Sequence, residues 1–341
     1  GFARMTGGAG ALGWLAGIEA QFGTIDARRY LNIRRRKGAL TARTDQRAHT
    51  LNAYGELRYS PAPTLTLIAG GQAVQGRRAV RDRIVPERSD AASFTEVSPK
   101  VGLLWQATPA IQLFANISRA GELPTFSELV QTGYTDFVPL DAQRSWTFEA
   151  GTRGSAGPLR WDVALYRSAL RGELLSYVND PALPALTLNA DRTRHQGIEA
   201  ALDWTLRPGV TLRTAYTLND FRFVGDRSYS DNRLPVVPVH RLFAELDLRM
   251  GAVGLRPSLD WLPRGAWADY ENSARAPGYV LAGLGGTLAL SPRATLFLDA
   301  RNLGNRRGIA DIAAVKRAAA ASAIYYPLEG RSFYGGVRIE L

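Results

Sequence analysis

The side chains that could do chemistry in this sequence are mainly arginines, because the usual catalytic and metal-binding residue types are scarce. Cysteine is absent, and the only three histidines, His49, His195 and His240, lie far apart without the spacing of a zinc site. Guanidinium groups bind anionic oxygens as two-pronged forks and stay charged at any physiological pH. We therefore expect recognition of an anionic ligand, with no resident metal or cofactor, and a structural role for His195.

The positive charge is concentrated in one stretch. Residues 22–49 contain eight Lys or Arg against two acids, so they carry +6 of the net charge of +11. The eight are Arg28, Arg29, Arg34, Arg35, Arg36, Lys37, Arg43 and Arg47. Net charge alone would suggest nucleic acid, but its location matters more than its total. We predict no nucleic-acid partner.

No set of residues has the arrangement of an enzyme active site. Asp and Glu are spread along the predicted strands, so no carboxylate pair stands out as acid and base. Gly283, Gly285 and Gly286 lie in an alternating strand pattern rather than at a strand–helix turn, which argues against a nucleotide cradle. We predict that the protein is not an enzyme.

The elements that must position these residues are strands with one apolar face. In residues 11–21 the apolar positions are Leu12, Trp14, Ala16, Ile18 and Ala20, which is period two. About fourteen such runs occur, near residues 11–21, 50–60, 63–75, 98–107, 110–119, 143–154, 159–171, 187–206, 209–223, 239–250, 253–262, 278–290, 294–303 and 331–341. No stretch approaches the roughly 20 apolar residues of a membrane-spanning helix. A membrane would be crossed with strands.

The connections alternate between six short turns and seven long loops. The short turns lie at residues 60–63, 108–110, 155–158, 207–209, 250–252 and 291–293. The long loops far exceed the usual connection of about 4 to 6 residues, and residues 313–323 of the last one have the composition of a short helix. This asymmetry indicates an outer-membrane barrel, with short periplasmic turns and long extracellular loops, whereas a soluble β-sandwich would not require it.

Tryptophans and charges support this fold class. Six of the seven tryptophans, Trp14, Trp105, Trp146, Trp161, Trp204 and Trp261, fall on the apolar sets, as expected of aromatic girdles at the two water boundaries. The opposite sets contain Glu149, Arg153, Arg213, Glu245, Asp247, Arg249, Asp299 and Arg301. A dry core could not hold so many charges. We predict an all-β, antiparallel transmembrane β-barrel portion with a wet lumen.

Seven segments of the sequence resemble the TonB-dependent receptor barrel, especially its ferric-siderophore branch. They are SPKVGLLWQATPAIQLFANISRAGELPTFSEL (98–129), WTFEAGTRG (146–154), WDVALYRSALRGELL (161–175), NADRTRHQGIEAALDW (189–204), RLPVVPVHRL (233–242), APGYVLAGLGGTL (276–288) and LFLDARNLGNRR (296–307). The resemblance implies a 22-stranded barrel closed by an N-terminal plug. Residues 1–341 would be the C-terminal part of the barrel, with the plug and first strands absent. We then expect residues 11–21 and 331–341 to be the edges of an open sheet.

What the resemblance implies about function is transport. The protein would be a multi-pass receptor of the bacterial outer membrane that takes up a ferric siderophore by active transport. The TonB–ExbB–ExbD complex would supply energy through the missing N-terminal region, and iron would enter only within the bound chelate. The alternatives are a receptor for cobalamin, haem or a glycan, or else a passive outer-membrane pore or an adhesin-like barrel.

The predicted ligand contacts lie in the long loops, and we place residues 28–47 in an extracellular loop. Arg34, Arg35, Arg36 and the neighbouring Lys37 suit the oxygens of an anionic iron chelate. Contact with lipopolysaccharide phosphates in the outer-membrane lipid, or simple solvation, explains the same charges equally well. Aromatic candidates are Tyr134, Phe137, Tyr177, Tyr229, Trp267 and Tyr270, which could stack on a chelate or pack the loops.

Overall fold

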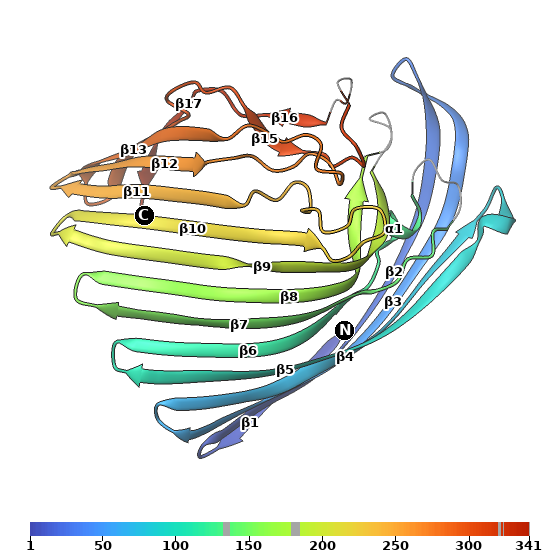
Figure 1. Ribbon diagram of the computed structural model, residues 1–341, viewed down its shortest axis with the longest axis horizontal. Coiled ribbons are helices and arrows are strands. Elements are labelled where there is room, and N and C mark those ends of the chain that lie inside the picture. The colour runs from blue at the N-terminus through green and yellow to red at the C-terminus, as the bar shows by residue number, and fades with distance from the viewer. Residues whose placement is uncertain (132–136, 179–184, 320–321, 323, 341) are drawn as a thin grey trace. The chain divides into compact units, whose positions relative to one another are not determined.

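The computed structural model describes residues 1–131, 137–178, 185–319, 322 and 324–340 (Figure 1). The strands are β1 (Phe2–Ala9), β2 (Leu12–Ile33), β3 (Arg36–Ala62), β4 (Leu65–Asp82), β5 (Asp90–Thr108), β6 (Ile111–Glu122), β7 (Gln143–Ala156), β8 (Leu159–Tyr177), β9 (Leu186–Arg207), β10 (Val210–Phe223), β11 (His240–Met250), β12 (Val253–Leu262), β13 (Tyr279–Ser291), β14 (Ala294–Arg301), β15 (Ile309–Ile312), β16 (Tyr325–Pro327) and β17 (Ser332–Ile339). Two short helices are η1 (Pro86–Arg88) and α1 (Phe126–Leu129). None of the described helices is long and apolar enough to cross a membrane.

Strands that follow each other along the chain lie side by side. Within the described residues, a 15-stranded sheet runs in the order β1 to β14 and then β17, and β15 pairs with β16 in a separate small sheet. The pairings along β1 to β4, along β10 to β14 and β17, and between β15 and β16 are antiparallel. The predicted all-β class, an antiparallel transmembrane barrel portion, is confirmed.

Two-residue turns join successive strands at what we call the basal end. They lie at residues 10–11, 63–64, 109–110, 157–158, 208–209, 251–252 and 292–293. Gly209 and Gly251 adopt φ values of 77° and 59° in these turns, a conformation that glycine enters without steric cost. The six predicted short turns are confirmed. The turn at 10–11 was not foreseen, since it joins β1, which sequence analysis missed.

The prediction that residues 11–21 form an edge is wrong. Strand β2 pairs with β1 on one side and with β3 on the other. The segment FARMTGGA of β1 contains neighbouring glycines and little apolar alternation, so it gave no strand pattern. Strand β17 is the last in the sheet order, as expected of residues 331–341.

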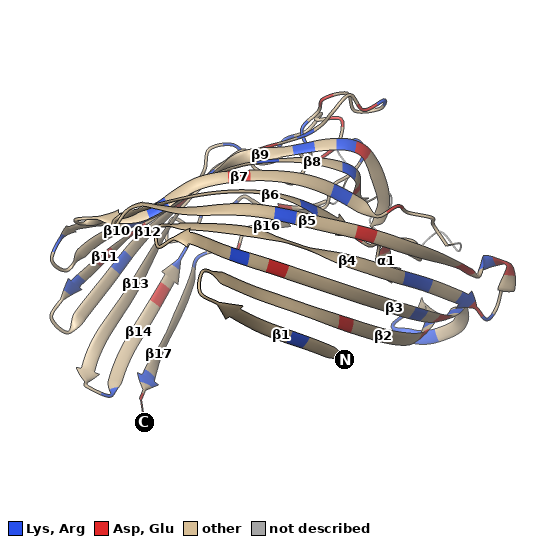
Figure 2. Ribbon diagram, turned by 90° about the horizontal axis from the view of Figure 1, so that it is seen from below, with Lys and Arg blue, Asp and Glu red and all other residues tan. Residues whose placement is uncertain are grey.

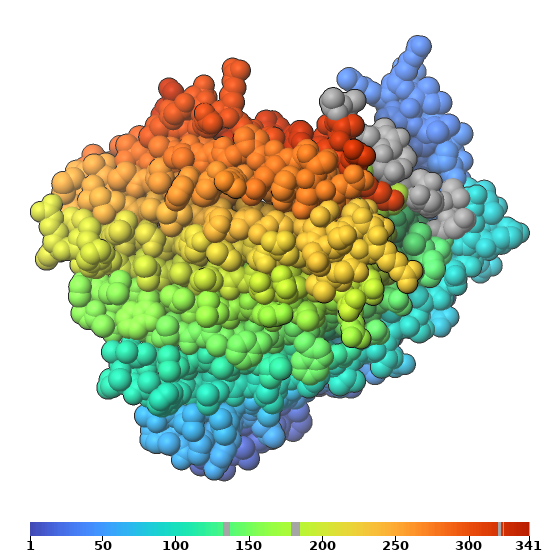
Figure 3. Space-filling view, in the orientation of Figure 1, coloured from blue at the N-terminus to red at the C-terminus, as the bar shows by residue number. Residues whose placement is uncertain are grey.

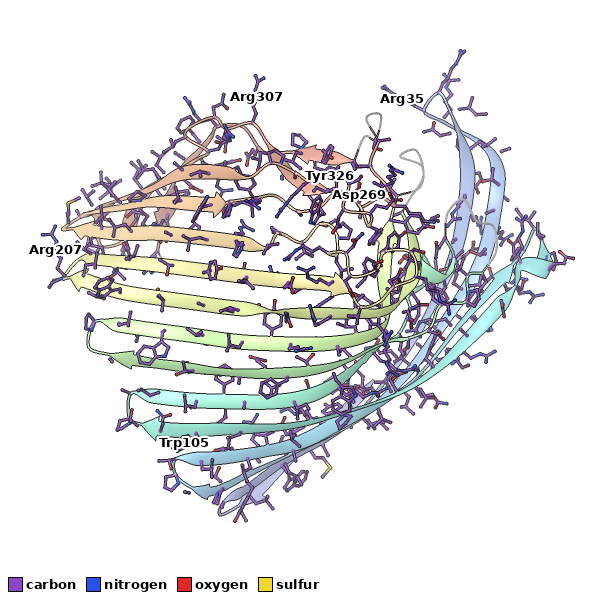
Figure 4. The ribbon with its side chains drawn as sticks, viewed as in Figure 1. Arg35, Trp105, Arg207, Asp269, Arg307 and Tyr326 are labelled. Atoms are coloured by element: carbon purple, nitrogen blue, oxygen red, sulfur yellow. The ribbon has the colours of Figure 1, made fainter. Side chains whose placement is uncertain are left out.

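One face of the sheet is apolar and exposed, as a lipid-facing surface must be. Trp105 and Trp204 are 46% and 48% exposed, so they are not core residues of a sandwich. Figure 4 shows Trp105 close to the basal turn that follows β5. The prediction that these tryptophans face lipid near the water boundary agrees with this placement.

The other face of the sheet is polar, and several of its charges form ion pairs. Arg213 on β10 lies 3.2 Å from Glu245 and 3.1 Å from Asp247 on β11. Arg301 lies 2.7 Å from Asp299 on β14. These are the residue types predicted to line a wet lumen, and ion pairing offsets part of their desolvation.

Residues 28–47 do not form a loop, so that prediction is wrong. Strands β2 and β3 are 22 and 27 residues long, although about 9 to 11 residues cross a membrane. They continue as one hairpin to a two-residue turn at Arg34 and Arg35 (Figures 1 and 3). Beyond Phe22 polar and apolar residues still alternate, but the polar residues now occupy the face that is apolar before Phe22. This exchange made the stretch resemble a polar loop.

The described residues of the last long connection are extended rather than helical. Strand β15 pairs with β16, and Asp269 forms a parallel bridge with Val315. Residues 313–319 therefore lack the helix expected there, because their backbone groups bond to neighbouring segments. Ala313 N, for example, donates to Ile324 O at 2.8 Å.

The chain groups into two compact units. Unit 1 comprises Gly1–Leu104, Asn116–Phe148 and Ala169–Thr193. Unit 2 comprises Trp105–Ala115, Glu149–Ser168 and Arg194–Leu341. The sites below are each built from residues of one unit.

The two-faced sheet predicts opposite effects of one charge on neighbouring positions. Leu202, on the apolar face of β9, is exposed, and Ala201 is exposed on the polar face. Leu202→Arg in the full-length receptor should lower the free energy of unfolding by about 1–3 kcal/mol, because the charge must enter lipid between the basal water boundary and the bilayer midplane. Ala201→Arg, the matched control, should cost much less. Urea titration of the receptor folded into phospholipid vesicles measures both, and equal costs would contradict the assignment of faces.

Candidate functional site

The tip of the β2–β3 hairpin holds the predicted cationic residues together. Arg34 and Arg35 form its turn with φ values of 49° and 67°. This type I′ geometry normally selects asparagine or glycine, and it costs other residues about 1 kcal/mol or more each. Asn32 compensates in part, because its Oδ1 accepts a hydrogen bond from Arg35 N at 2.8 Å. The turn therefore keeps two guanidinium groups where smaller residues would fold more easily.

The predicted Arg36 and Lys37 begin β3 directly after this turn. Lys37 Nζ lies 3.8 Å from the ring centroid of Tyr30, a cation–π contact that holds the ammonium group against β2. Figure 4 shows Arg35 at the end of the hairpin, with its side chain directed away from the strands. The tip presents several cations within one turn of chain and suits a multiply charged anion.

Below the tip, Asp26 organises two further arginines. Its carboxylate lies 2.8 Å from Arg28 and 3.4 Å from Arg43. The hydrogen bond from Arg28, with the charges of both arginines, lowers the pKa of Asp26 to about 2. Because this pKa is depressed, the ion pair is complete above the ordinary value of 3.8 and is lost only as the pH falls through about 2. The hairpin charge is therefore constant over the physiological range.

Two predicted aromatics, Tyr229 and Tyr270, meet in a loop cluster of unit 2. Their ring centroids are 5.5 Å apart, and both contact Phe223, at 5.0 Å and 5.8 Å. Tyr270 is only 3% exposed. The cluster packs the connection after β10 against the one after β12, which accounts for both tyrosines without a ligand. Phe223 was not foreseen, although it ends the alternating run of β10.

Trp267, also predicted, stacks with an arginine that sequence reasoning missed. The Arg275 guanidinium lies 5.3 Å from the Trp267 ring centroid, and its Nε donates to Gly265 O at 2.8 Å. Burial and the nearby charge of Arg264 lower the pKa of Arg275. Its charge is therefore held in a partly desolvated place, where an approaching anion would be favoured.

Asp269 ties the loop of Trp267 and Tyr270 to the last long connection. It is fully buried and accepts hydrogen bonds from Ser273 N at 2.7 Å, from Ser273 Oγ and from Ala318 N at 2.8 Å. Figure 4 places Asp269 among these loops, near β16. The spacing of Asp269 and Ser273 is a local signal for a side-chain-stabilised turn, but the bond to Ala318 could not be read from sequence.

Of the remaining predicted aromatics, Phe137 and Tyr177 belong to unit 1. Tyr134 falls outside the described residues. Phe137 is half-buried in the connection after α1, and Tyr177 is half-buried at the end of β8. Near them, Gln131 and Thr187 exchange two hydrogen bonds, from Gln131 Nε2 to Thr187 O and from Thr187 N to Gln131 Oε1. The structure thus unites Arg34–Arg36 at one tip and Tyr229 with Tyr270 in one cluster. Ligand contact by any of them stays a prediction.

A small cavity opens under the unit 2 loops. It has a volume of about 160 Å³, and its polar lining includes Arg241, Tyr279 and Asp311. Arg241 is held by Asp260 at 2.7 Å. Ligand sites usually measure about 300–1,000 Å³, so this cavity fits part of a chelate rather than a whole one. Among the described residues, no three His, Asp or Glu side chains are grouped as metal ligands.

Comparison with known proteins agrees with this architecture. Residues 4–303 match the family model described as TonB dependent receptor-like, beta-barrel. A curated relative, the metal-pseudopaline receptor CntO of Pseudomonas aeruginosa, is 25% identical over 231 residues, which cover 65% of this chain and 31% of CntO.

Solved structures show the same fold. The ferric yersiniabactin uptake receptor FyuA from Yersinia pestis superposes with a TM-score of 0.78 at 17% identity, covering 99% of this chain and 53% of FyuA. The copper transporter OprC superposes with a TM-score of 0.80 at 16% identity, covering 98% of this chain and 55% of OprC. The chain therefore spans about a third to about half of the proteins that it matches.

The buried position of Asp269 predicts a loop-specific defect. In Asp269→Ala, three donors lose their acceptor, so the loop around Trp267 and the segment near Ala318 should separate. We expect proteolytic cleavage in residues 263–277 to be about tenfold faster, with an unchanged urea midpoint of the barrel. The control is Glu271→Ala, which removes an acid of the same loop whose 3.4 Å ion pair with Arg317 is exposed and therefore contributes little. Equal cleavage of the two variants would show that Asp269 does not hold the loop.

Proposed function

Because the chain belongs to the TonB-dependent receptor family, we propose that the whole protein takes up a ferric siderophore by TonB-coupled active transport. Members of this family are outer-membrane receptors and transporters rather than enzymes, and this chain is a portion of such a barrel in the bacterial outer membrane. The single observation that carries the proposal is the family match over residues 4–303. The chain contributes strands to the transporter, together with the loops at the distal end of the sheet, which is the end opposite the basal turns.

The choice of an anionic metal chelate is supported by the relatives and by the distal cations. CntO is named as a receptor for metal-pseudopaline, and FyuA as a receptor for ferric yersiniabactin. The hairpin tip of Arg34, Arg35 and Arg36 offers guanidinium forks that match carboxylate, hydroxamate or catecholate oxygens. A field from these cations concentrates anions near the entrance.

A second candidate is the chelate of a metal other than iron. The name of CntO refers to a metal without saying which one, and OprC is a copper transporter. Arginine forks contact the oxygens of a chelator and not its metal, so the tip does not discriminate between these substrates. Coupling to the TonB–ExbB–ExbD complex and contacts with outer-membrane lipid and lipopolysaccharide are further parts of the proposal.

Uptake by a deletion strain that carries the full-length receptor tests the proposal. We expect labelled ferric siderophores to enter only when TonB is present, because active uptake depends on energy from the inner membrane. Nickel, zinc and copper chelates serve as the competing panel. Transport of those chelates alone would favour the second candidate, and ferric uptake that persists without TonB would show a passive pore.

The hairpin tip predicts a salt-dependent contribution to binding. Replacing Arg34, Arg35, Arg36 and Lys37 together by glutamine should weaken ferric-chelate binding about three- to tenfold, with a larger loss at low ionic strength. Barrel stability should stay the same, since exposed charges contribute little to folding. The control replaces Arg160, Arg207 and Arg293, exposed arginines beside basal turns, by glutamine. Wild-type binding by the tip variant at every salt concentration would remove these residues from the site.

A further inference from the structure

Six arginines lie in rows across the distal parts of β2 and β3 and at the distal end of β4, which Arg83 follows directly. The strand registers and the bond from Arg83 N to Arg43 O define the rows as Phe22–His49–Arg77, Thr24–Arg47–Ala79, Asp26–Asp45–Arg81 and Arg28–Arg43–Arg83. We call the six arginines, with Asp26 and Asp45, the arginine patch. Figure 2 shows basic residues in blue toward the distal ends of β3 and β4.

The arginine patch lies on the apolar, lipid-facing side of the sheet. Because side chains alternate along a strand, Asp26 and Arg28 share a face with Trp14, Ile18 and the other even-numbered apolar residues of β2. Burial confirms this assignment. The intervening residues Thr44, Gln46, Val80 and Asp82 are buried on the polar side, whereas Arg47, Arg81 and Arg83 are exposed.

The height of the arginine patch matches the boundary of the lipid. The apolar face of β2 runs from Leu12 to Phe22, which is about the 9 to 11 residues that a tilted strand needs to cross the hydrocarbon. Phe22 is 76% exposed and packs edge-on against His49, with ring centroids 5.3 Å apart. His49 on β3 pairs in turn with Arg77 on β4, so Arg77 lies at the same height as Phe22. The guanidinium groups therefore begin where the hydrocarbon ends.

The charge of the arginine patch is only partly compensated. Asp26 is bound by Arg28 and Arg43, and Asp45 by Arg83. Arg77 donates to Ser93 Oγ at 3.3 Å, whereas Arg47 and Arg81 have no side-chain partner among the described residues. Six guanidinium groups against two carboxylates leave an excess of four positive charges on this face.

A second arginine cluster, in unit 2, differs from the arginine patch in how its charges are paired. Distal to the apolar face of β10, Asp220 lies 2.7 Å from Arg222, 3.0 Å from Arg233 and 3.4 Å from Arg194. There each arginine is directed at one shared carboxylate, and burial lowers the pKa of Arg233. In the arginine patch, by contrast, Arg47 and Arg81 remain open to an external anion.

We propose that the arginine patch binds the phosphate groups of lipopolysaccharide in the outer leaflet of the membrane. Guanidinium forks pair with phosphate oxygens, and the patch continues the lipid-facing surface directly at headgroup height. A soluble chelate on the transport path would meet the polar side of the sheet instead. The assignment rests on the outer-membrane location in the proposed function and is independent of the transported solute.

The test uses the purified full-length receptor with Arg47, Arg77 and Arg81 replaced together by glutamine. We expect binding of phosphorylated lipopolysaccharide in detergent to weaken about tenfold, equivalent to about 1.4 kcal/mol. The loss should grow at low ionic strength. A second variant, with lysine at the same three positions, keeps the charge but loses the guanidinium fork, so its affinity should lie between those of the glutamine variant and the wild type. This intermediate affinity separates lost charge from a folding defect.

The matched control is Arg34→Gln, Arg35→Gln and Arg36→Gln. These residues lie in the same hairpin but about 35 Å farther along β3 than Arg47, at about 3.3 Å per residue, and should leave lipopolysaccharide binding unchanged. Dephosphorylated lipopolysaccharide should bind the wild type as weakly as the glutamine patch variant binds the intact lipid. Wild-type binding by that patch variant, an equal loss in the tip variant, or equal affinity for the dephosphorylated lipid would each overturn the proposal. Ferric uptake assayed in parallel keeps the proposed function separately testable.

Discussion

Pairing of every backbone N–H and C=O within the hydrocarbon is the constraint on which the rest of this structure depends. Water is absent there, so each strand must bond to its neighbours along its whole length. Two-residue turns such as Pro208–Gly209 satisfy this with the least chain, because antiparallel neighbours follow directly. The same pairing fixes the register, and the register decides which side chains meet lipid and which meet water. Tryptophans on one face and paired charges on the other follow from that single choice.

The register does not end where the lipid ends. In the β2–β3 hairpin, pairing is regular from Leu12 to Arg29, so each face continues from the hydrocarbon into the headgroup layer. Only the residue types change: on the lipid-facing side Ile18 and Phe22 give way to Asp26 and Arg28, while Ile25 falls on the opposite side. An arginine in this hairpin can therefore be assigned to lipid headgroups or to the polar side by its parity and height, which net charge alone does not reveal.

The sequence was sufficient for features that repeat locally. Trp105, Trp204 and the turn at 208–209 could be predicted because period-two alternation and turn residues are visible within about ten positions. Strand β1 was missed because Gly7 and Gly8 interrupt the alternation. The distal hairpin was missed because exchanged faces look like a polar loop. The contact of Phe223 with Tyr270 joins residues far apart in the chain, and no local pattern encodes it.

Arginine predominates at both distal sites, the hairpin tip and the arginine patch, and the same property of the guanidinium group suits it to each. A guanidinium is planar and weakly hydrated, so it can lie near hydrocarbon and still fork onto an oxyanion, whereas an ammonium group is strongly hydrated. All six cations of the arginine patch are arginine, although lysine would supply equal charge. At the hairpin tip, Arg34 and Arg35 hold left-handed conformations that glycine adopts more easily. Backbone strain there and uncompensated charge at the lipid boundary both lower folding stability. Folding alone therefore does not account for either cluster, whereas the anionic partners proposed above would account for both.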